Sequence, residues 1–226
     1  VISLPGAGNG LMRGSLYVDR TGVYGGDLIV VTTAGEVWRV NTAGGTTKIA
    51  DVGIHLEGVI TVPNDVAKYG ILAGKIIAGQ ENTGRLYIFD NGGFISSPFV
   101  GVNIEDIDLI TPNENFFGVN FGTGRLLGAP AADFAGLVGD ILLTQEFHGG
   151  TSGLFALSWN GVSLVVEQVT LSGGSAFAGQ WEHVTFSSAG IVEIPPTDPN
   201  PIPEPATIVL LGVGAVAALR RRRKAA

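Results

Sequence analysis

The sequence predicts an all-β protein, and three observations support that prediction. Of the 226 residues, 35 are glycine and 11 are proline, a composition typical of many short strands joined by many turns. Hydrophobic residues make up 45 % of the chain and charged residues only 15 %, so the chain is apolar enough to bury a core and is not disordered. The third observation is an internal repeat, which defines the individual strands.

The repeat consists of four consecutive strand-like segments, each bounded by glycine or by another turn signal. The first segments of the three clearest copies are 26–33 (GDLIVVTT), 74–81 (GKIIAGQE) and 139–146 (GDILLTQE). The second segments are 35–45, 84–93 and 153–161, the third are 46–52, 94–100 and 162–169, and the fourth are 56–62, 104–110 and 181–187. A partial copy at 121–134, which matches 81–94, indicates a further unit between the second and third copies, and residues 11–19 match residues 55–63.

Units of four strands that recur about every 40–50 residues are typical of the blades of a β-propeller. A β-sandwich is the alternative all-β architecture, but sandwiches do not repeat internally. We therefore predict a β-propeller-like array of about four blades over residues 1–194, without helices, in which Trp38, Trp159 and Trp181 pack between blades. Because the chain begins at Val1 with neither a closing strand nor a leader, we expect it to be part of a larger ring of roughly six or seven blades.

Three glutamates stand at equivalent positions near the start of the fourth segments: Glu57, Glu105 and Glu182. If these segments line the central channel, the carboxylates converge at its mouth and would bind Ca²⁺ or Mg²⁺, which prefer oxygen ligands. Alternatively, each glutamate caps its strand by accepting backbone N–H groups from the neighbouring blade. Arg13, which occupies the same position in residues 11–19, favours the second interpretation.

Two aspartates flank this pattern in the second copy. Asp106 and Asp108 should share one face of their strand, with Glu105 on the other. A glutamate that opens the innermost strand resembles the six-bladed family of SMP-30, gluconolactonase and NHL proteins. That resemblance implies a central cation that polarises a lactone or phosphoester, with a carboxylate as base.

Composition and charge exclude several functions. The chain contains no cysteine, so it has no disulfide framework, zinc–thiolate site or cysteine nucleophile. Five of its 13 cationic side chains lie in residues 220–224, so residues 1–219 carry 8 cationic against 20 acidic side chains, a net charge of −12. An acidic body of this kind repels phosphate backbones, and we expect no nucleic-acid partner.

Residues 195–226 differ in character from the rest of the chain. Residues 195–205 are a proline-rich spacer, 206–219 contain no charged side chain, and 220–226 are basic. As a helix, residues 206–219 would span about 21 Å, and snorkelling arginines with local thinning can match this length to a hydrocarbon core of about 30 Å. We predict a single transmembrane helix whose cytoplasmic end is set by Arg220, Arg221, Arg222 and Arg223. A buried helix of a soluble domain is the alternative, which four consecutive arginines disfavour.

The order of Pro203-Glu204-Pro205, a short apolar helix and an arginine cluster resembles the PEP-CTERM sorting signal over residues 202–224. The resemblance implies recognition by exosortase, a membrane-embedded cysteine transpeptidase of Gram-negative bacteria that make exopolysaccharide. It further implies that Pro203, Glu204 and Pro205 are the recognition residues. The body would first be held at the inner membrane on its periplasmic side, and processing would release it to the cell surface or the medium.

Two functions from different classes remain open. The favoured one is a non-enzymatic binding or structural module of the cell envelope or the exopolysaccharide matrix, without a catalytic residue. The alternative is a metal-dependent hydrolase, a lactonase or esterase of the SMP-30 type. Further asparagine and aspartate ligands in other blades would favour the enzyme.

Overall fold

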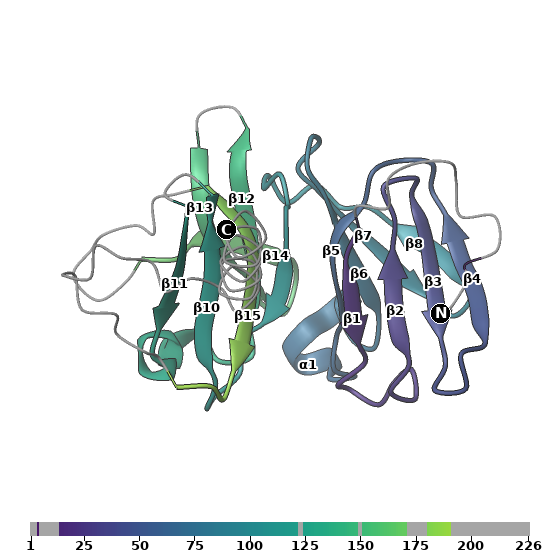
Figure 1. Ribbon diagram of the computed structural model, residues 1–226, viewed down its shortest axis with the longest axis horizontal. Helices are drawn as coiled ribbons and strands as arrows, with labels where there is room; N and C mark the ends of the chain where they lie inside the picture. Colours follow the sequence, from purple (N-terminus) through teal and green to yellow (C-terminus); the bar gives the residue numbers. More distant parts are fainter. Residues whose placement is uncertain (1–3, 5–13, 122–123, 149–150, 171–179, 191–226) are drawn as a thin grey trace, which may run out of the picture. The chain divides into compact units, whose positions relative to one another are not determined.

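Four antiparallel sheets in a propeller-like arrangement make up the computed structural model, which describes residues 4, 14–121, 124–148, 151–170 and 180–190 (Figure 1). The first sheet contains β1 (Leu16–Val18), β2 (Leu28–Val31), β3 (Glu36–Val40) and β4 (Thr46–Asp51). The second contains β5 (Glu57–Thr61), β6 (Ile76–Gln80), β7 (Arg85–Asp90) and β8 (Gly93–Ser96). The third contains β9 (Ile107–Leu109), β12 (Ile141–His148), β13 (Thr151–Trp159) and β14 (Leu164–Gln168), and the fourth contains β15 (Trp181–Ser187), β10 (Asn115–Asn120) and β11 (Arg125–Ala129).

The fourth segments of the repeat form innermost strands as predicted, but each of them opens a different sheet from the one that contains the other three segments of its copy. The opening strands are β1, β5, β9 and β15, and they fall within segments 11–19, 56–62, 104–110 and 181–187. Consecutive opening strands contact one another, β1 with β5, β5 with β9, and β9 with β15. They form the inner row of the arrangement, which confirms the all-β, propeller-like prediction.

The apolar core lies between neighbouring sheets rather than in one central layer. Three clusters of buried side chains fill the spaces between consecutive sheets. Ile29 and Ile76 belong to the cluster between the first and second sheets, Ile77 and Leu143 to that between the second and third, and Leu142 and Phe116 to that between the third and fourth. Because β6 is covered on both faces, all of its residues are buried. Within the described ranges, no such cluster joins the fourth sheet to the first, and a cavity lined by β1 and β15 lies there instead.

The fourth sheet is not continuous in sequence, so the prediction of strictly sequential four-stranded units is wrong. Strands β10 and β11 form a hairpin inserted between β9 and β12, and β10 pairs with β15. Phe116 of β10 contacts Trp181 and Phe186 of β15, with ring centroids 5.5 and 5.9 Å apart, which favours this distant pairing. The partial copy at 121–134 corresponds to β11 and the start of a 3₁₀ helix, η3 (Ala131–Leu137).

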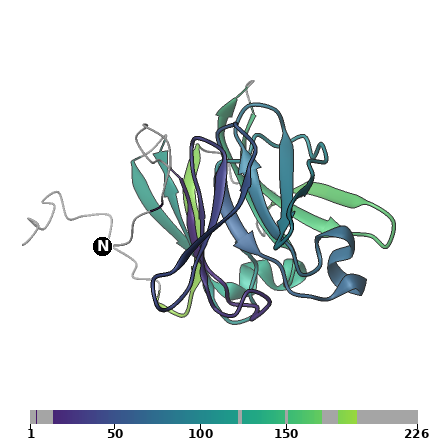
Figure 2. The same ribbon diagram turned by 90° about the vertical axis from the view of Figure 1, so that its right-hand side faces the viewer.

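Short helical segments in the described residues also correct the prediction of a body without helices. Helices α1 (Val66–Tyr69) and η1 (Gly70–Leu72) connect β5 to β6, and η3 follows β11 (Figures 1 and 2). Asp65 begins α1, because its side chain accepts hydrogen bonds from two backbone N–H groups of the helix. Tyr69 and Leu72 are buried in the core between the second and third sheets, and this tertiary contact stabilises a single turn that would not form alone.

A buried carboxylate joins the first sheet to the second. The Asp19 carboxylate accepts hydrogen bonds from the backbone N–H groups of Thr21, Tyr24 and Gly26 at 3.0, 2.8 and 3.1 Å and from the hydroxyls of Thr21 and Thr61 at 2.6 and 2.7 Å. Burial alone would raise the pKa of this carboxyl, but the hydrogen bonds outweigh burial and lower the pKa to about 2. Asp19 therefore stays ionised and holds the loop after β1 against β5.

Two of the three tryptophans pack between sheets as predicted. Trp181 is fully buried between the third and fourth sheets. Trp159 of β13 lies against Gly70, where any Cβ would meet the indole ring. Trp38 is buried on a face of the first sheet rather than between two sheets, and its indole N–H donates to Glu36 at 3.2 Å.

Several sequence predictions concern residues outside the described ranges. These are the spacer, the membrane helix and the basic tail of residues 195–226, together with Arg13. In the part of the chain that the structure describes, no helix is both long and apolar enough to span a membrane.

Candidate functional site

Antiparallel pairing brings two glutamates together in each of the middle two sheets. The opening strand begins beside the end of the second strand, so Glu57 at the start of β5 lies near Glu81, which follows β6. In the third sheet, the Glu105 backbone N–H donates to the Thr144 carbonyl of β12 at 3.0 Å, two residues before Glu146. The ladder geometry therefore delivers four carboxylates to one place.

These four glutamates line a cavity of about 680 Å³, and its other acidic or imidazole side chains are Glu182, His55 and His183. All three glutamates that the repeat singles out, Glu57, Glu105 and Glu182, thus line the same cavity. Two groups of ligand atoms converge in it, each group with all atoms within 4.8 Å of one another: His55, Glu57 and Glu81, and Glu81, Glu105 and Glu146. Glu182 belongs to neither group.

Glu105 is the most deeply buried carboxyl of the cavity. The residue is 6 % exposed, and its Oε2 atom has no hydrogen-bond partner. Burial, followed by the neighbouring carboxyls of Glu81 and Glu57, raises the pKa of Glu105 to about 10. The metal-free protein therefore holds this carboxyl protonated at neutral pH, and a bound cation would take the place of that proton.

His55 stands between two of the carboxylates. Its Nε2 atom lies 2.6 Å from Glu57 Oε1, and its Nδ1 atom lies 3.8 Å from Glu81 Oε2. An imidazole nitrogen is a common metal ligand, and here it lies beside carboxylate oxygens. The cavity therefore presents both oxygen and nitrogen ligands.

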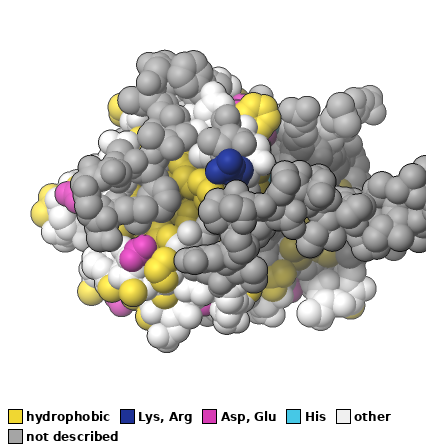
Figure 3. Space-filling model, turned by 60° about the vertical axis from the view of Figure 1, so that its left-hand side comes forward, with side chains coloured by type: hydrophobic (Ala, Val, Ile, Leu, Met, Phe, Trp, Pro, Cys, Tyr) yellow, Lys and Arg dark blue, Asp and Glu magenta, His cyan; other side chains and the backbone are white. Residues whose placement is uncertain are grey.

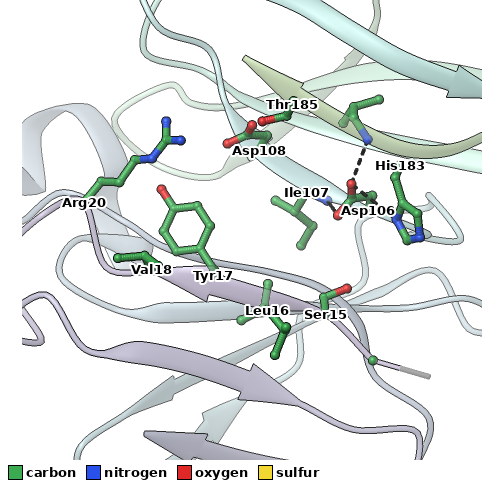
Figure 4. A pocket seen from close by; sticks show the side chains of 13 residues that line it. Ser15, Leu16, Tyr17, Val18, Arg20, Asp106, Ile107, Asp108, His183 and Thr185 are labelled. Atoms are coloured by element: carbon green, nitrogen blue, oxygen red, sulfur yellow. Dashed lines mark hydrogen bonds and ion pairs between the residues drawn. The ribbon is translucent and has the colours of Figure 1, made fainter. Parts of the chain in front are cut away.

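A second cavity, of about 420 Å³, adjoins the first between β1, β9 and β15 (Figure 4). The two cavities share Gly14, Ser15 and His183 in their linings. Tyr17 and Arg20 line the second cavity on the side away from His183 (Figure 4). The acidic cavity thus continues into a space that carries hydroxyl, aromatic and cationic groups.

Asp106 and Asp108 project from the β9 segment toward β15. They accept hydrogen bonds from the backbone N–H groups of Val184 and Phe186 at 2.8 and 3.0 Å. The aspartates therefore perform the strand-capping role that the sequence suggested for the glutamates, and they share a face as predicted. Burial raises the pKa of Asp108 to about 6. Asp106 Oδ2 lies 3.7 Å from His183 Nδ1, and this carboxylate raises the pKa of His183.

Sequence reasoning missed two of the converging carboxylates, Glu81 and Glu146, although a signal for them exists. Both belong to a Gln-Glu pair near the end of the second strand of their sheet, and in each case the pair closes its aligned segment, 74–81 or 139–146. The equivalent residue is Thr33 in the first sheet and Phe121 in the fourth. Because the second and third sheets have a glutamate at this position and the first and fourth do not, the Gln-Glu pair marks the side of the ring on which the carboxylates gather.

The outer face of the fourth sheet contrasts with this cavity. Figure 3 looks toward that side of the molecule, and its described surface shows apolar side chains with few charged ones. Val119 of β10 lies opposite Leu126 of β11, and both are exposed. These side chains offer no ligand atoms, so the acidic cavity is the candidate site.

Comparison with known proteins identifies the tail. Residues 201–224 match the family model of the PEP-CTERM protein-sorting motif, which confirms the resemblance seen in residues 202–224. No curated protein matches the chain. The motif is the recognition signal of exosortase, and it implies an exported protein that is anchored in the membrane before processing. The chain therefore joins a C-terminal sorting signal to a four-sheet, propeller-like body.

Proposed function

We propose that this chain is an exported binding protein whose body holds a Ca²⁺ ion between Glu81, Glu105 and Glu146. Exosortase processing near Pro203-Glu204-Pro205 would release the body from the inner membrane to the surface of a Gram-negative cell. There it would act as a non-enzymatic module of the envelope or the exopolysaccharide matrix. The observation that carries the cation site is Glu105, a buried carboxyl with an unpartnered oxygen among other carboxyls.

The geometry suits a hard cation of the size of Ca²⁺. Calcium takes oxygen ligands at about 2.3–2.6 Å, so ligands on opposite sides of the ion are about 5 Å apart. The oxygen atoms of Glu81, Glu105 and Glu146 lie within 4.8 Å of one another and would all reach such an ion. We favour Ca²⁺ over Mg²⁺ because three carboxylates from two sheets form an irregular cage, whereas Mg²⁺ demands near-octahedral geometry.

Calorimetric titration of the full 226-residue chain in detergent, after treatment with EDTA, tests this proposal. We expect one Ca²⁺ per chain, with an affinity of about 10⁻⁴–10⁻³ M, as in extracellular calcium modules. Glu105→Gln and Glu146→Gln should each weaken binding at least about tenfold. Glu182→Gln is the matched control, because Glu182 lines the same cavity outside the ligand group. Absence of Ca²⁺ binding, or an equal loss in Glu182→Gln, would contradict the proposed site.

Hydrolysis of a lactone or ester of the SMP-30 type is the second candidate, and the pairing of His183 with Asp106 favours it. His183 borders both cavities, and a histidine positioned by a carboxylate can act as a general base beside a bound cation. An enzyme of this kind would hydrolyse a lactone only with Ca²⁺ present, and His183→Ala would remove activity without changing Ca²⁺ affinity. A protein that binds Ca²⁺ but hydrolyses neither lactones nor esters supports the binding function.

A further inference from the structure

We infer that the acidic cavity holds a second metal ion, a first-row transition metal such as Zn²⁺, between His55, Glu57 and Glu81. This inference rests on the proposed Ca²⁺ position, with which it shares the Glu81 carboxylate. The two ions would form a dinuclear centre in which Glu81 is the bridge. The argument uses the geometry of the ligands, their chemical type and the charge of the cavity.

The ligand atoms of His55, Glu57 and Glu81 already converge. They lie within 4.8 Å of one another, and His55 Nε2 is 2.6 Å from Glu57 Oε1. Around a tetrahedral Zn²⁺ with bonds of about 2.0–2.2 Å, neighbouring ligands are about 3.3 Å apart. An ion would therefore replace the direct contact of His55 with Glu57 and separate these two atoms by less than an ångström. Three protein ligands leave one position of the ion open to water.

The two groups differ in chemical type. The group of Glu81, Glu105 and Glu146 contains oxygen ligands only, which suit Ca²⁺ and Mg²⁺. The group with His55 adds an imidazole nitrogen, which suits Zn²⁺ and other transition metals. Because Glu81 belongs to both groups, its two oxygen atoms can serve one ion each. The cavity is therefore built for two different cations.

The negative charge of the cavity also favours the binding of a second cation. Five glutamates line it, so one divalent ion leaves a charge of −3 when all five are ionised, and a second reduces this to −1. Glu57 Oε2 is a further buried oxygen without a hydrogen-bond partner, next to the Glu105 carboxyl. A carboxylate-bridged pair of ions can activate a water molecule, so this second position is the one that hydrolytic chemistry would need.

Metal analysis of the full chain, purified in detergent without a histidine tag, tests the second position. The protein is stripped with EDTA, saturated with Ca²⁺, titrated with Zn²⁺ and analysed for both metals after gel filtration. We expect one Ca²⁺ and one Zn²⁺ per chain. His55→Ala should weaken Zn²⁺ binding at least about tenfold and leave Ca²⁺ unchanged. Glu146→Gln should weaken Ca²⁺ binding and leave Zn²⁺ binding unchanged, and Glu81→Gln should weaken the binding of both metals.

His183→Ala is the matched control, because His183 lines the same cavity outside both ligand groups. It should keep both metals, and near-UV circular dichroism shows that each variant is folded. The inference is overturned if Zn²⁺ binding survives His55→Ala, if His183→Ala weakens it equally, or if Zn²⁺ displaces Ca²⁺ one for one. Zn²⁺ bound through His55 without any Ca²⁺ binding would support the second position and overturn the proposed calcium site alone.

Discussion

Replacing Glu105 by glutamine should make the metal-free protein more stable at neutral pH and remove its response to Ca²⁺. Glutamine has nearly the shape of a protonated glutamate, so the packing of this buried side chain changes little. The difference is that glutamine never ionises. Burial, with the neighbouring Glu81 and Glu57, raises the pKa of the Glu105 carboxyl from 4.5 to about 10 in the folded protein. The fold therefore opposes an ionisation that is free in the unfolded chain.

The size of the effect follows from these two pKa values. Because the folded-state pKa is raised, the unfolded chain releases the Glu105 proton near pH 4.5, whereas the folded protein keeps it up to about pH 10. Between these limits the stability of the wild type falls by about 1.4 kcal/mol per pH unit, which amounts to about 3 kcal/mol at pH 7. The Glu105→Gln variant does not lose this stability, because glutamine does not ionise in either state. For a domain of this size the melting temperature should rise by about 6–12 °C.

Thermal unfolding of the full chain in EDTA, followed by circular dichroism between pH 4 and 8, measures this difference. Wild type and Glu105→Gln should melt together near pH 4 and diverge as the pH rises. Added Ca²⁺ should raise the melting temperature of the wild type and leave the variant unchanged, because a ligand stabilises only the protein that binds it. Two proteins of equal stability at both pH 4 and pH 7, or a less stable variant at pH 7, would refute the reasoning.

Three further predictions concern the fold and the tail. Asp19→Asn should lower the free energy of unfolding at pH 7, measured by urea denaturation, by about 2 kcal/mol, because hydrogen bonds lower the pKa of Asp19 from 3.8 to about 2. This contribution to stability is lost as the pH falls toward 2, where wild type and variant should unfold at the same urea concentration. Trp181→Ala removes a fully buried ring from the core between the third and fourth sheets, and it should lower the free energy of unfolding by about 3–5 kcal/mol. A decrease of less than about 1 kcal/mol would contradict the pairing of β10 with β15. Glu204→Ala should accumulate uncleaved in the inner membrane of an exosortase-positive host, whereas deletion of Arg220–Arg223 should disturb orientation instead. Cell fractionation with an antibody against the body measures both, and identical behaviour of wild type and Glu204→Ala would show that the tail is only an anchor.

The sequence predicted much of the fold because the relevant signals are local. Short apolar runs between glycine turns mark β2, β6 and β12, and each lies where its aligned segment predicts. The one-turn helix α1 escaped prediction because Pro63-Asn64-Asp65 is a turn signal as well as a helix start. Of the candidate site, Glu57, Glu105 and Glu182 were predicted from the repeat, whereas Glu81, Glu146 and the nitrogen ligand His55 were not.

The all-β class, the innermost strands and the sorting signal could be predicted from the sequence, because turns, strand periodicity and a contiguous motif depend on neighbouring residues. The pairing of β15 with β10 could not be predicted in this way, because it depends on how Trp181 and Phe186 pack against Phe116 in the folded chain. The tertiary structure also decided which carboxylates meet. Glutamates at the start of one strand and the end of its partner become neighbours only when the ladder forms, and those of two sheets converge only when the sheets pack.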